Sequence, residues 1–203
     1  MDFYRQFQQS LQNRQPEQAL QHLQKHLAHN PRHAHGLYQA GMLMRDLGQW
    51  PQALNAFLEA CRLEPENSEY LTGLGIIYNQ LQKPDSAIHA FDAAYETNRD
   101  PGILYNRSMA LLLAGQYQEG WEDYEHRVKV HKNKKILYEW HPAAKLWQGQ
   151  PFPDQTLVVY NEQGLGDDIQ FCRYLPFLKA WGGNVIFITQ QSLIPVMSTL
   201  FGV

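Results

Sequence analysis

Apolar and polar positions alternate with a helical period through most of the chain, and most regularly from Leu37 to Pro65. Small residues recur there among large apolar ones at spacings of three and four, which predicts two amphipathic helices. The small residues are Ala40, Gly41, Ala53 and Ala60, and the large ones are Leu37, Met44, Leu47, Trp50, Leu54 and Phe57. Gly48 falls at the expected turn between the helices. Because mixed side-chain sizes let helices pack ridges into grooves, the stretch predicts a helical hairpin that stacks on neighbours.

The pattern returns about every 34 residues, and in this respect the chain resembles the tetratricopeptide repeat. The matching positions of the next copy are Leu71, Leu74, Gly75, Tyr78, Ala87, Phe91 and Ala94. A fourth copy, one residue out of phase, contains Leu104, Ser108, Leu111, Gly115 and Tyr117. The first copy is weaker and rich in glutamine, as expected of a capping repeat whose outer face stays in water. We therefore expect a mainly α-helical superhelix with repeats at residues 1–33, 34–67, 68–100 and 101–130.

The resemblance also implies a function, because the first helices of such repeats line the concave side of the stack and usually bind an extended peptide or another protein. By their phase, the groove residues of this chain are Tyr4, Gln8, Tyr38, Met42, Arg45, Thr72, Ile76, Asn79, Tyr105 and Met109. Tyr and Met with one Arg are typical of adaptable interfaces, although the same side chains would also suit the core. Similar repeats in O-linked N-acetylglucosamine transferases carry an Asn in every repeat, and here only Asn106 matches.

Residues 131–155 follow the repeats and contain several prolines, which predicts a linker whose Trp140 and Trp147 anchor onto the helical stack. The period then changes from helical to extended. Two short apolar runs, Thr156 to Tyr160 and Val185 to Thr189, flank a Gly-rich turn and an amphipathic helix from about Asp168 to Trp181. This order predicts two parallel strands joined by a crossover helix.

A second helix is expected from Ser192 to Phe201, with Pro195 in its first turn. Residues 156–203 are therefore expected to form a truncated Rossmann-like βαβα segment of the α/β class. A sheet of two strands leaves apolar edges and an uncovered face, so this segment is expected either to self-associate into a homo-oligomer or to collapse onto the repeat stack.

The turn of this segment reads Gly164-Leu165-Gly166-Asp167-Asp168. A dinucleotide fingerprint would need a third glycine where Ile169 stands, and two acids at a helix start disfavour a pyrophosphate. From the residues alone, the glycines serve a turn and the acids either cap the helix or hold a carboxylate for proton transfer.

Over a wider span, residues 120–203 resemble the start of the glycosyltransferase-like domain that follows tetratricopeptide repeats in many bacterial proteins. That domain is similar to heptosyltransferases and to O-linked N-acetylglucosamine transferase, which have two Rossmann-like halves in the GT-B arrangement. The resemblance implies that Asp167 acts as general base on an acceptor hydroxyl. It also implies an acceptor loop, which consists here of Glu162, Gln163, Gly164 and Gly166.

The chain stops at Val203, about where a third strand of such a domain would begin. Glycosyl transfer requires a donor held against an acceptor, so we expect the 203-residue chain to be inactive alone. Two readings follow: a protein–protein interaction scaffold that binds a partner in the groove, which we favour, and an N-terminal fragment of a nucleotide-sugar-dependent glycosyltransferase. No cofactor is expected on the first reading.

The composition limits the kinds of partner, compartment and metal site that the chain is expected to have. A net charge of -3 disfavours nucleic-acid binding, and no apolar run approaches the ~20 residues of a membrane span. Cys61 and Cys172 fit free thiols of a cytoplasmic protein better than a disulfide. His22 and His26 are one helical turn apart, yet no Cys or spaced carboxylate completes a metal site, so none is expected.

Overall fold

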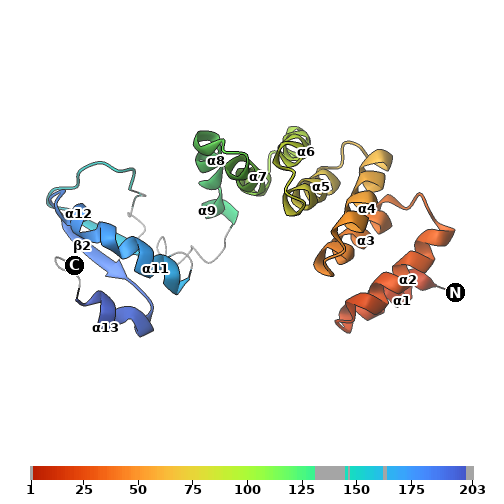
Figure 1. The fold of residues 1–203 in the computed structure, drawn as a ribbon, viewed down its shortest axis with the longest axis horizontal. Helices are drawn as coiled ribbons and strands as arrows, with labels where there is room; N and C mark the ends of the chain where they lie inside the picture. The colour runs from red at the N-terminus through yellow and green to blue at the C-terminus, as the bar shows by residue number, and fades with distance from the viewer. Residues whose placement is uncertain (1, 131–144, 146, 162–163, 200–203) are drawn as a thin grey trace. The chain divides into compact units, whose positions relative to one another are not determined.

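The computed structural model describes residues 2–130, 145, 147–161 and 164–199. The chain divides into two compact units, residues 1–136 and 137–203. Helix pairs follow one another along the first unit, as the repeat pattern predicts (Figure 1). Its helices are α1 (Phe3–Gln12), α2 (Pro16–His29), α3 (Ala34–Asp46), α4 (Trp50–Leu63), α5 (Ser68–Gln80), α6 (Pro84–Thr97), α7 (Pro101–Leu113), α8 (Tyr117–Tyr124) and α9 (Arg127–Val130).

Each hairpin turn contains one residue in the left-handed region of φ, followed by the start of the second helix. Gly48 (φ 73°) and Gly115 (φ 79°) occupy this position in two repeats, whereas Arg14 and Gln82 (both φ 56°) occupy it in the other two. A proline lies in the first turn of α2, α4 and α6, where its fixed φ suits the helix. A glycine at the turn, a proline at the start of the second helix, or both therefore mark each hairpin in the sequence.

The helices of a pair pack through a small residue that faces an aromatic ring. Phe57 on α4 and Phe91 on α6 are fully buried. A β-carbon at Gly41 would lie 2.9 Å from the Phe57 ring, and one at Gly75 would lie 2.6 Å from the Phe91 ring. Glycine at these two positions thus lets the first helix approach the ring more closely than any other residue would allow.

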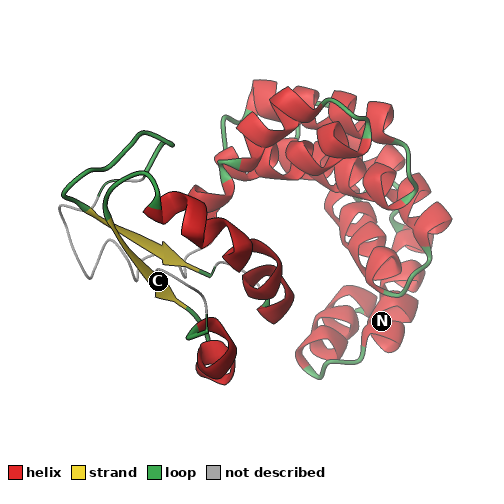
Figure 2. Ribbon diagram, turned by 60° about the vertical axis from the view of Figure 1, so that its left-hand side comes forward, coloured by secondary structure: helices red, strands yellow, loops and turns green. Residues whose placement is uncertain are grey.

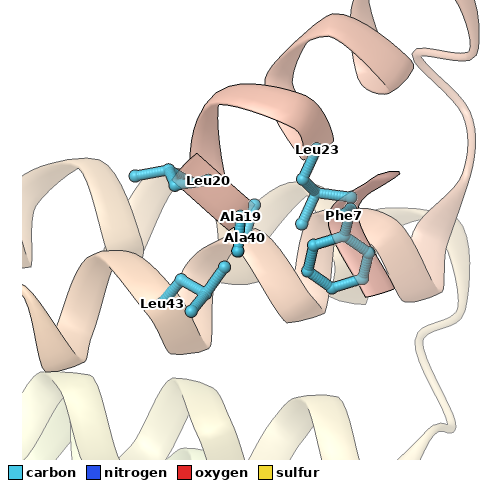
Figure 3. Packing of buried hydrophobic residues seen from close by; sticks show 6 residues of the cluster. All are labelled: Phe7, Ala19, Leu20, Leu23, Ala40 and Leu43. Carbon is cyan, nitrogen blue, oxygen red and sulfur yellow. The ribbon is translucent and has the colours of Figure 1, made fainter. Parts of the chain in front are cut away.

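The first repeat reverses this arrangement of sizes. Phe7 on α1 stands where the other repeats have Gly41, Gly75 and Ser108, and Leu23 on α2 stands where they have larger aromatic residues. Both Phe7 and Leu23 are fully buried, in a cluster with Ala19, Leu20, Ala40 and Leu43 that joins α1 and α2 to α3 (Figure 3).

The second unit contains two parallel strands, β1 (Thr156–Tyr160) and β2 (Asn184–Ile188), with Thr156 opposite Asn184 and Tyr160 opposite Ile188. The predicted parallel pairing is confirmed. The predicted helix between the strands begins earlier and is interrupted, because it consists of α11 (Leu165–Phe171), a 3₁₀ turn (Cys172–Tyr174) and α12 (Leu175–Lys179). Pro176 in the first turn of α12 cannot donate a backbone hydrogen bond, which favours a break there.

The second predicted helix is also shorter than expected. It consists of a 3₁₀ turn (Gln191–Leu193) and α13 (Ile194–Met197), with Pro195 in the first turn, while residues 200–203 lie outside the described residues. Two strands and these short helices make a small α/β unit. A sheet of two strands is too small to assign this unit to the Rossmann-like folds.

Trp147 belongs to the core of the second unit, whereas the sequence suggested an anchor on the helical stack. Its ring lies 6.1 Å from Phe152 and 5.6 Å from Trp181, between ring centroids. The Trp147 indole N–H donates to the carbonyl of Gln150 at 2.7 Å. Phe152, Leu175 and Val185 form the buried centre of this core. Trp140 lies outside the described residues.

The left-handed turn positions generate a stability prediction. Replacing Gln82 by glycine is expected to stabilise the repeat unit by about 0.5–1 kcal/mol, because the relief of left-handed strain exceeds the added entropy of the unfolded chain. Gly48→Gln places the same side chain at the equivalent turn and is expected to destabilise by a similar amount. Urea unfolding followed by circular dichroism measures both. Equal stability of the two variants would contradict the prediction.

Candidate functional site

The first helices of the pairs lie on the inner side of the repeat stack. α3 contacts α5, and α5 contacts α7, whereas the second helices make no comparable contacts with one another in the part of the chain that the structure describes. Helices crowd together on the inside of a curved stack, so the first helices line the concave face. Figure 2 shows the curvature of this unit as an arc of helices.

The groove residues predicted from the sequence form rows that cross from one first helix to the next. One row contains Tyr4, Tyr38, Thr72 and Tyr105, with Asn106 beside it; a second contains Gln8, Met42, Ile76 and Met109; a third contains Arg45 and Asn79. None of these side chains is buried, and Met109 is 40% exposed. The structure therefore leaves every one of them at least partly accessible.

Tyr38 is the most firmly held member of the first row. Its ring stacks on Tyr70 of α5 at 5.0 Å between centroids and lies 5.8 Å from the buried ring of Phe57. Burial, followed by the nearby Glu69 carboxylate, raises the pKa of Tyr38 to about 12. Tyr38 is therefore a neutral phenol at physiological pH.

Several groove residues also serve the fold. Met42 packs against the core cluster of Phe57, and Ile76 packs against that of Phe91. The Thr72 hydroxyl donates to the carbonyl of Ser68 at 2.7 Å. Sequence reasoning left open whether such side chains belong to a surface or to the core, and in the structure these three contribute to both.

The polar members of the groove differ in their partners. The Arg45 guanidinium donates two hydrogen bonds to Asp46, its neighbour on α3, at 2.9 and 2.7 Å. Asn79 has a buried side-chain oxygen with no hydrogen-bond partner among the described residues. The Tyr105 ring lies 5.7 Å from Tyr124, between centroids.

Tyr4 joins the first repeat to the second through side-chain contacts. Its hydroxyl donates to Gln39 of α3 at 2.9 Å, and its ring lies 5.0 Å from His26 and 5.3 Å from His33. The two histidines face each other, with His26 Nε2 and His33 Nδ1 3.0 Å apart. This contact is a hydrogen bond only while one of the facing nitrogens lacks a proton.

Four charged residues of the repeat unit were not identified by the sequence analysis. Glu69 on α5 lies one turn before Thr72, in the row that also contains His35. Arg107 on α7 contacts Asp92 of α6 and donates to both oxygens of Asp123 on α8, at 2.7 and 3.2 Å. These hydrogen bonds, chiefly those from Asp123, raise the pKa of Arg107 above its ordinary value. Only the spacing of Arg107 midway between two Asp residues hinted at this ion triad.

The two acids in the turn of the second unit have different hydrogen-bond partners and different roles. An Asp167 oxygen accepts a hydrogen bond from the Gly164 backbone N–H at 3.0 Å, so this carboxylate caps α11. The neighbouring Asp168 is only 4% exposed and accepts a hydrogen bond of 2.5 Å from the Thr189 hydroxyl at the end of β2. Gly166 is exposed beside them, whereas Glu162 and Gln163 lie outside the described residues.

The second unit also exposes many large apolar side chains. Ile169, Phe171 and Phe177 are 56%, 54% and 69% exposed on α11 and α12, and Ile186 on β2 is 51% exposed. Among the described residues, no group of three His, Cys, Asp or Glu side chains could hold a metal ion. No helix in the described part of the chain is long and apolar enough to cross a membrane.

The sequence profile of the tetratricopeptide repeat family matches residues 38–102 and 80–125. Over residues 38–125, the helical unit therefore consists of tetratricopeptide repeats. Solved structures agree on this fold. MamA from Desulfovibrio magneticus RS-1 covers 69% of this chain and 84% of its own, with a TM-score of 0.59 and 20% identity.

A second solved tetratricopeptide repeat protein, YrrB, covers 70% of this chain and 77% of its own, with a TM-score of 0.56 and 20% identity. YrrB is described as having an unusual peptide-binding site. At identities this low, the similarity to MamA and YrrB concerns the fold alone.

Among curated proteins, FlbA of Caulobacter vibrioides is 28% identical over 196 residues, which cover 93% of this chain and 32% of FlbA. Small glutamine-rich tetratricopeptide repeat-containing protein 2 of Mycosarcoma maydis is 32% identical over 96 residues, which cover 46% of this chain and 27% of that protein. The chain thus spans about a third or less of these relatives. The match with FlbA includes most of the second unit as well as the tetratricopeptide repeats.

The histidine pair generates a prediction on pH. Burial, and then the charges of His26 and His35, lower the pKa of His33, so the folded chain binds this proton less readily than the unfolded chain. Its stabilising contribution is present above the unfolded pKa of about 6.5 and is lost as the pH falls through the folded pKa. We expect hydrogen exchange in α1 and α2, corrected for its intrinsic pH dependence, to accelerate several-fold between pH 7 and pH 5.

His26→Gln removes one of the two facing imidazoles and is expected to flatten this response. His29→Gln is the matched control, because His29 lies on the same helix and bonds the carbonyl of Lys25 instead. A response that is unchanged in His26→Gln, or equally flattened in His29→Gln, would contradict the role of the pair.

Proposed function

We propose that this chain is a protein–protein interaction scaffold whose concave groove binds an extended segment of a partner protein. The observation that carries this proposal is the set of accessible Tyr and Met side chains in register across the first helices. They are backed by a buried core, so they cannot collapse inward. The peptide-binding site described for YrrB supports the same use of the fold.

The chemistry of the groove suits such a partner. Tyr supplies a large contact area with few rotatable bonds, and Met adapts to irregular shapes. The rows repeat at the spacing of the helices, so an extended chain can meet equivalent side chains in successive repeats. Tyr38, held between Phe57 and Tyr70, needs little further ordering on binding.

The double variant Tyr38→Ala and Arg45→Ala tests this proposal. We expect enrichment of specific partners in quantitative affinity purification to fall by about tenfold, since Tyr and Arg dominate interface energetics. The matched control is Leu58→Ala with Arg62→Ala, which removes exposed side chains of similar type from the second helix α4. Partners retained equally by both double variants would place binding outside the groove.

The second candidate function is that of a glycosyltransferase of the GT-B type, to which the second unit would contribute part of the acceptor half. One observation favours it: acids and Thr189 gather at the carboxyl ends of parallel strands, where α/β proteins bind ligands. Asp167 would then act as general base from its position at the start of α11, using the carboxylate that now caps the helix.

Calorimetry with nucleotide diphosphate sugars distinguishes the two candidates. We expect no saturable binding by this chain, because Asp167 and Asp168 place negative charge where a diphosphate would approach the helix. Saturable binding that Asp167→Asn abolishes would instead support the glycosyltransferase. Asp154→Asn, an exposed acid outside the turn, is the control for a general effect of charge.

A further inference from the structure

Not every charged side chain on the concave face forms an ion pair within the described part of the chain. By phase, the charged side chains among the described residues in the groove rows, the row of Asn106 and the rows of Asp46 and Glu69 are Arg5, Arg45, Asp46 and Glu69. Arg45 and Asp46 neutralise each other at 2.7 Å. Glu69 makes no ion pair in the part of the chain that the structure describes, and its side chain is exposed. The Glu69 carboxylate on α5 therefore has no ion-pair partner among the described residues, and Arg5 lies two repeats away on α1.

Glu69 stands beside aromatic rings. Its charge acts on the phenols of both Tyr38 and Tyr70, and Glu64 adds to the negative charge near Tyr70. Tyr70 is 3% exposed, so it serves as the buried backing on which the accessible Tyr38 ring stacks. The result is a firmly packed, partly exposed aromatic ring that is hydrogen-bonded to the Glu69 carboxylate and lies 6.2 Å from the His35 ring, between centroids.

Helix stability alone accounts only in part for this acid. An acid in the first turn of a helix interacts favourably with the helix dipole, and Glu69 lies in the first turn of α5. Asn67, however, already caps that turn by accepting from the backbone N–H groups of Glu69 and Tyr70. The dipole also fails to explain why the acid lies next to Tyr38, on the inner face and across the boundary between two repeats.

We propose that the groove recognises a basic side chain, Lys or Arg, which lies across the Tyr38 ring and reaches the Glu69 carboxylate. Aromatic faces attract cations, and a carboxylate completes the site with a charge-assisted hydrogen bond. The thioether of Met42, in the next row of α3, lines the apolar stem of such a side chain. This inference rests on the proposed function of the groove and specifies the chemistry of the segment that binds there.

Selection of displayed random decapeptides on the full chain tests the proposal. We expect the selected peptides to be enriched in Lys and Arg and to lose roughly three- to tenfold in affinity for Glu69→Gln, a range set by exposed cation–π contacts and ion pairs. Their affinity for the wild type should fall with added salt, and more steeply than for Glu69→Gln.

Glu66→Gln is the matched control. Glu66 is an exposed acid three residues earlier, and unlike Glu64 and Glu69 it does not act on the phenols of Tyr38 and Tyr70. Glu69→Lys provides a second variant, for which the same selection should yield peptides enriched in Asp and Glu. Because Glu69 is exposed, neither substitution is expected to disturb folding.

The outcomes separate this inference from the proposed function. Peptides that need Tyr38 and Met109 but show neither basic enrichment nor sensitivity to Glu69→Gln would overturn the basic-residue site and leave the groove intact. Equal losses for Glu66→Gln and Glu69→Gln would reduce the effect to net charge and overturn the site as well. Failure to select any peptide that depends on Tyr38 or Met109 would overturn the groove together with this inference.

Discussion

The close approach of glycine to an aromatic ring sets the spacing of helices in the repeat unit. Phe57 meets Gly41 within its own pair and also Gly73 of the next pair, where a β-carbon would lie 2.8 Å from its ring. One ring thus fixes two helix contacts at once. Since the rows of the groove depend on how far successive first helices stand apart, the shape of the concave face follows from these buried contacts.

The first repeat satisfies the same constraint with the sizes exchanged. Phe7 supplies from the first helix the volume that Phe57 and Phe91 supply from the second, and Leu23 accepts it. The large ring therefore comes from the first helix in this repeat and from the second helix in the next two. The first repeat therefore matches the repeat pattern weakly in sequence, although its core residues Phe7 and Leu23 are as fully buried as Phe57 and Phe91.

Periodicity predicted the repeat unit well because each hairpin is specified by contacts between residues close in sequence. The turn glycines, the prolines of the second helices and the alternation of sizes are all local signals. The contacts within the second unit were harder to predict from the sequence. Trp147 meets Trp181 across β1 and the helices that follow it, and Asp168 meets Thr189 across those helices and β2, so neither contact leaves a periodic pattern in the sequence.

The features of the candidate site likewise divide into those that the sequence predicts and those that it does not. The phase of the repeat assigns each predicted groove residue a position on its helix, because that position follows from the residue number alone, and whether these positions bind a partner stays a prediction. It could not reveal that Arg45 is neutralised by its neighbour while Glu69 is not, or that His26 meets His33. These features depend on which side chains face each other between repeats, and residue type alone does not determine that.

The ion triad around Arg107 makes the C-terminal end of the repeat stack differ from its N-terminal end in its response to pH. A repeat array opens from its ends, because each repeat contacts only its neighbours. At the C-terminal end, Arg107 ties α6, α7 and α8 with a cation that keeps its proton at any physiological pH. At the N-terminal end, the corresponding link is an imidazole pair whose bond depends on a missing proton. Acidification is therefore expected to weaken the contact at the N-terminal end before the ion triad at the C-terminal end.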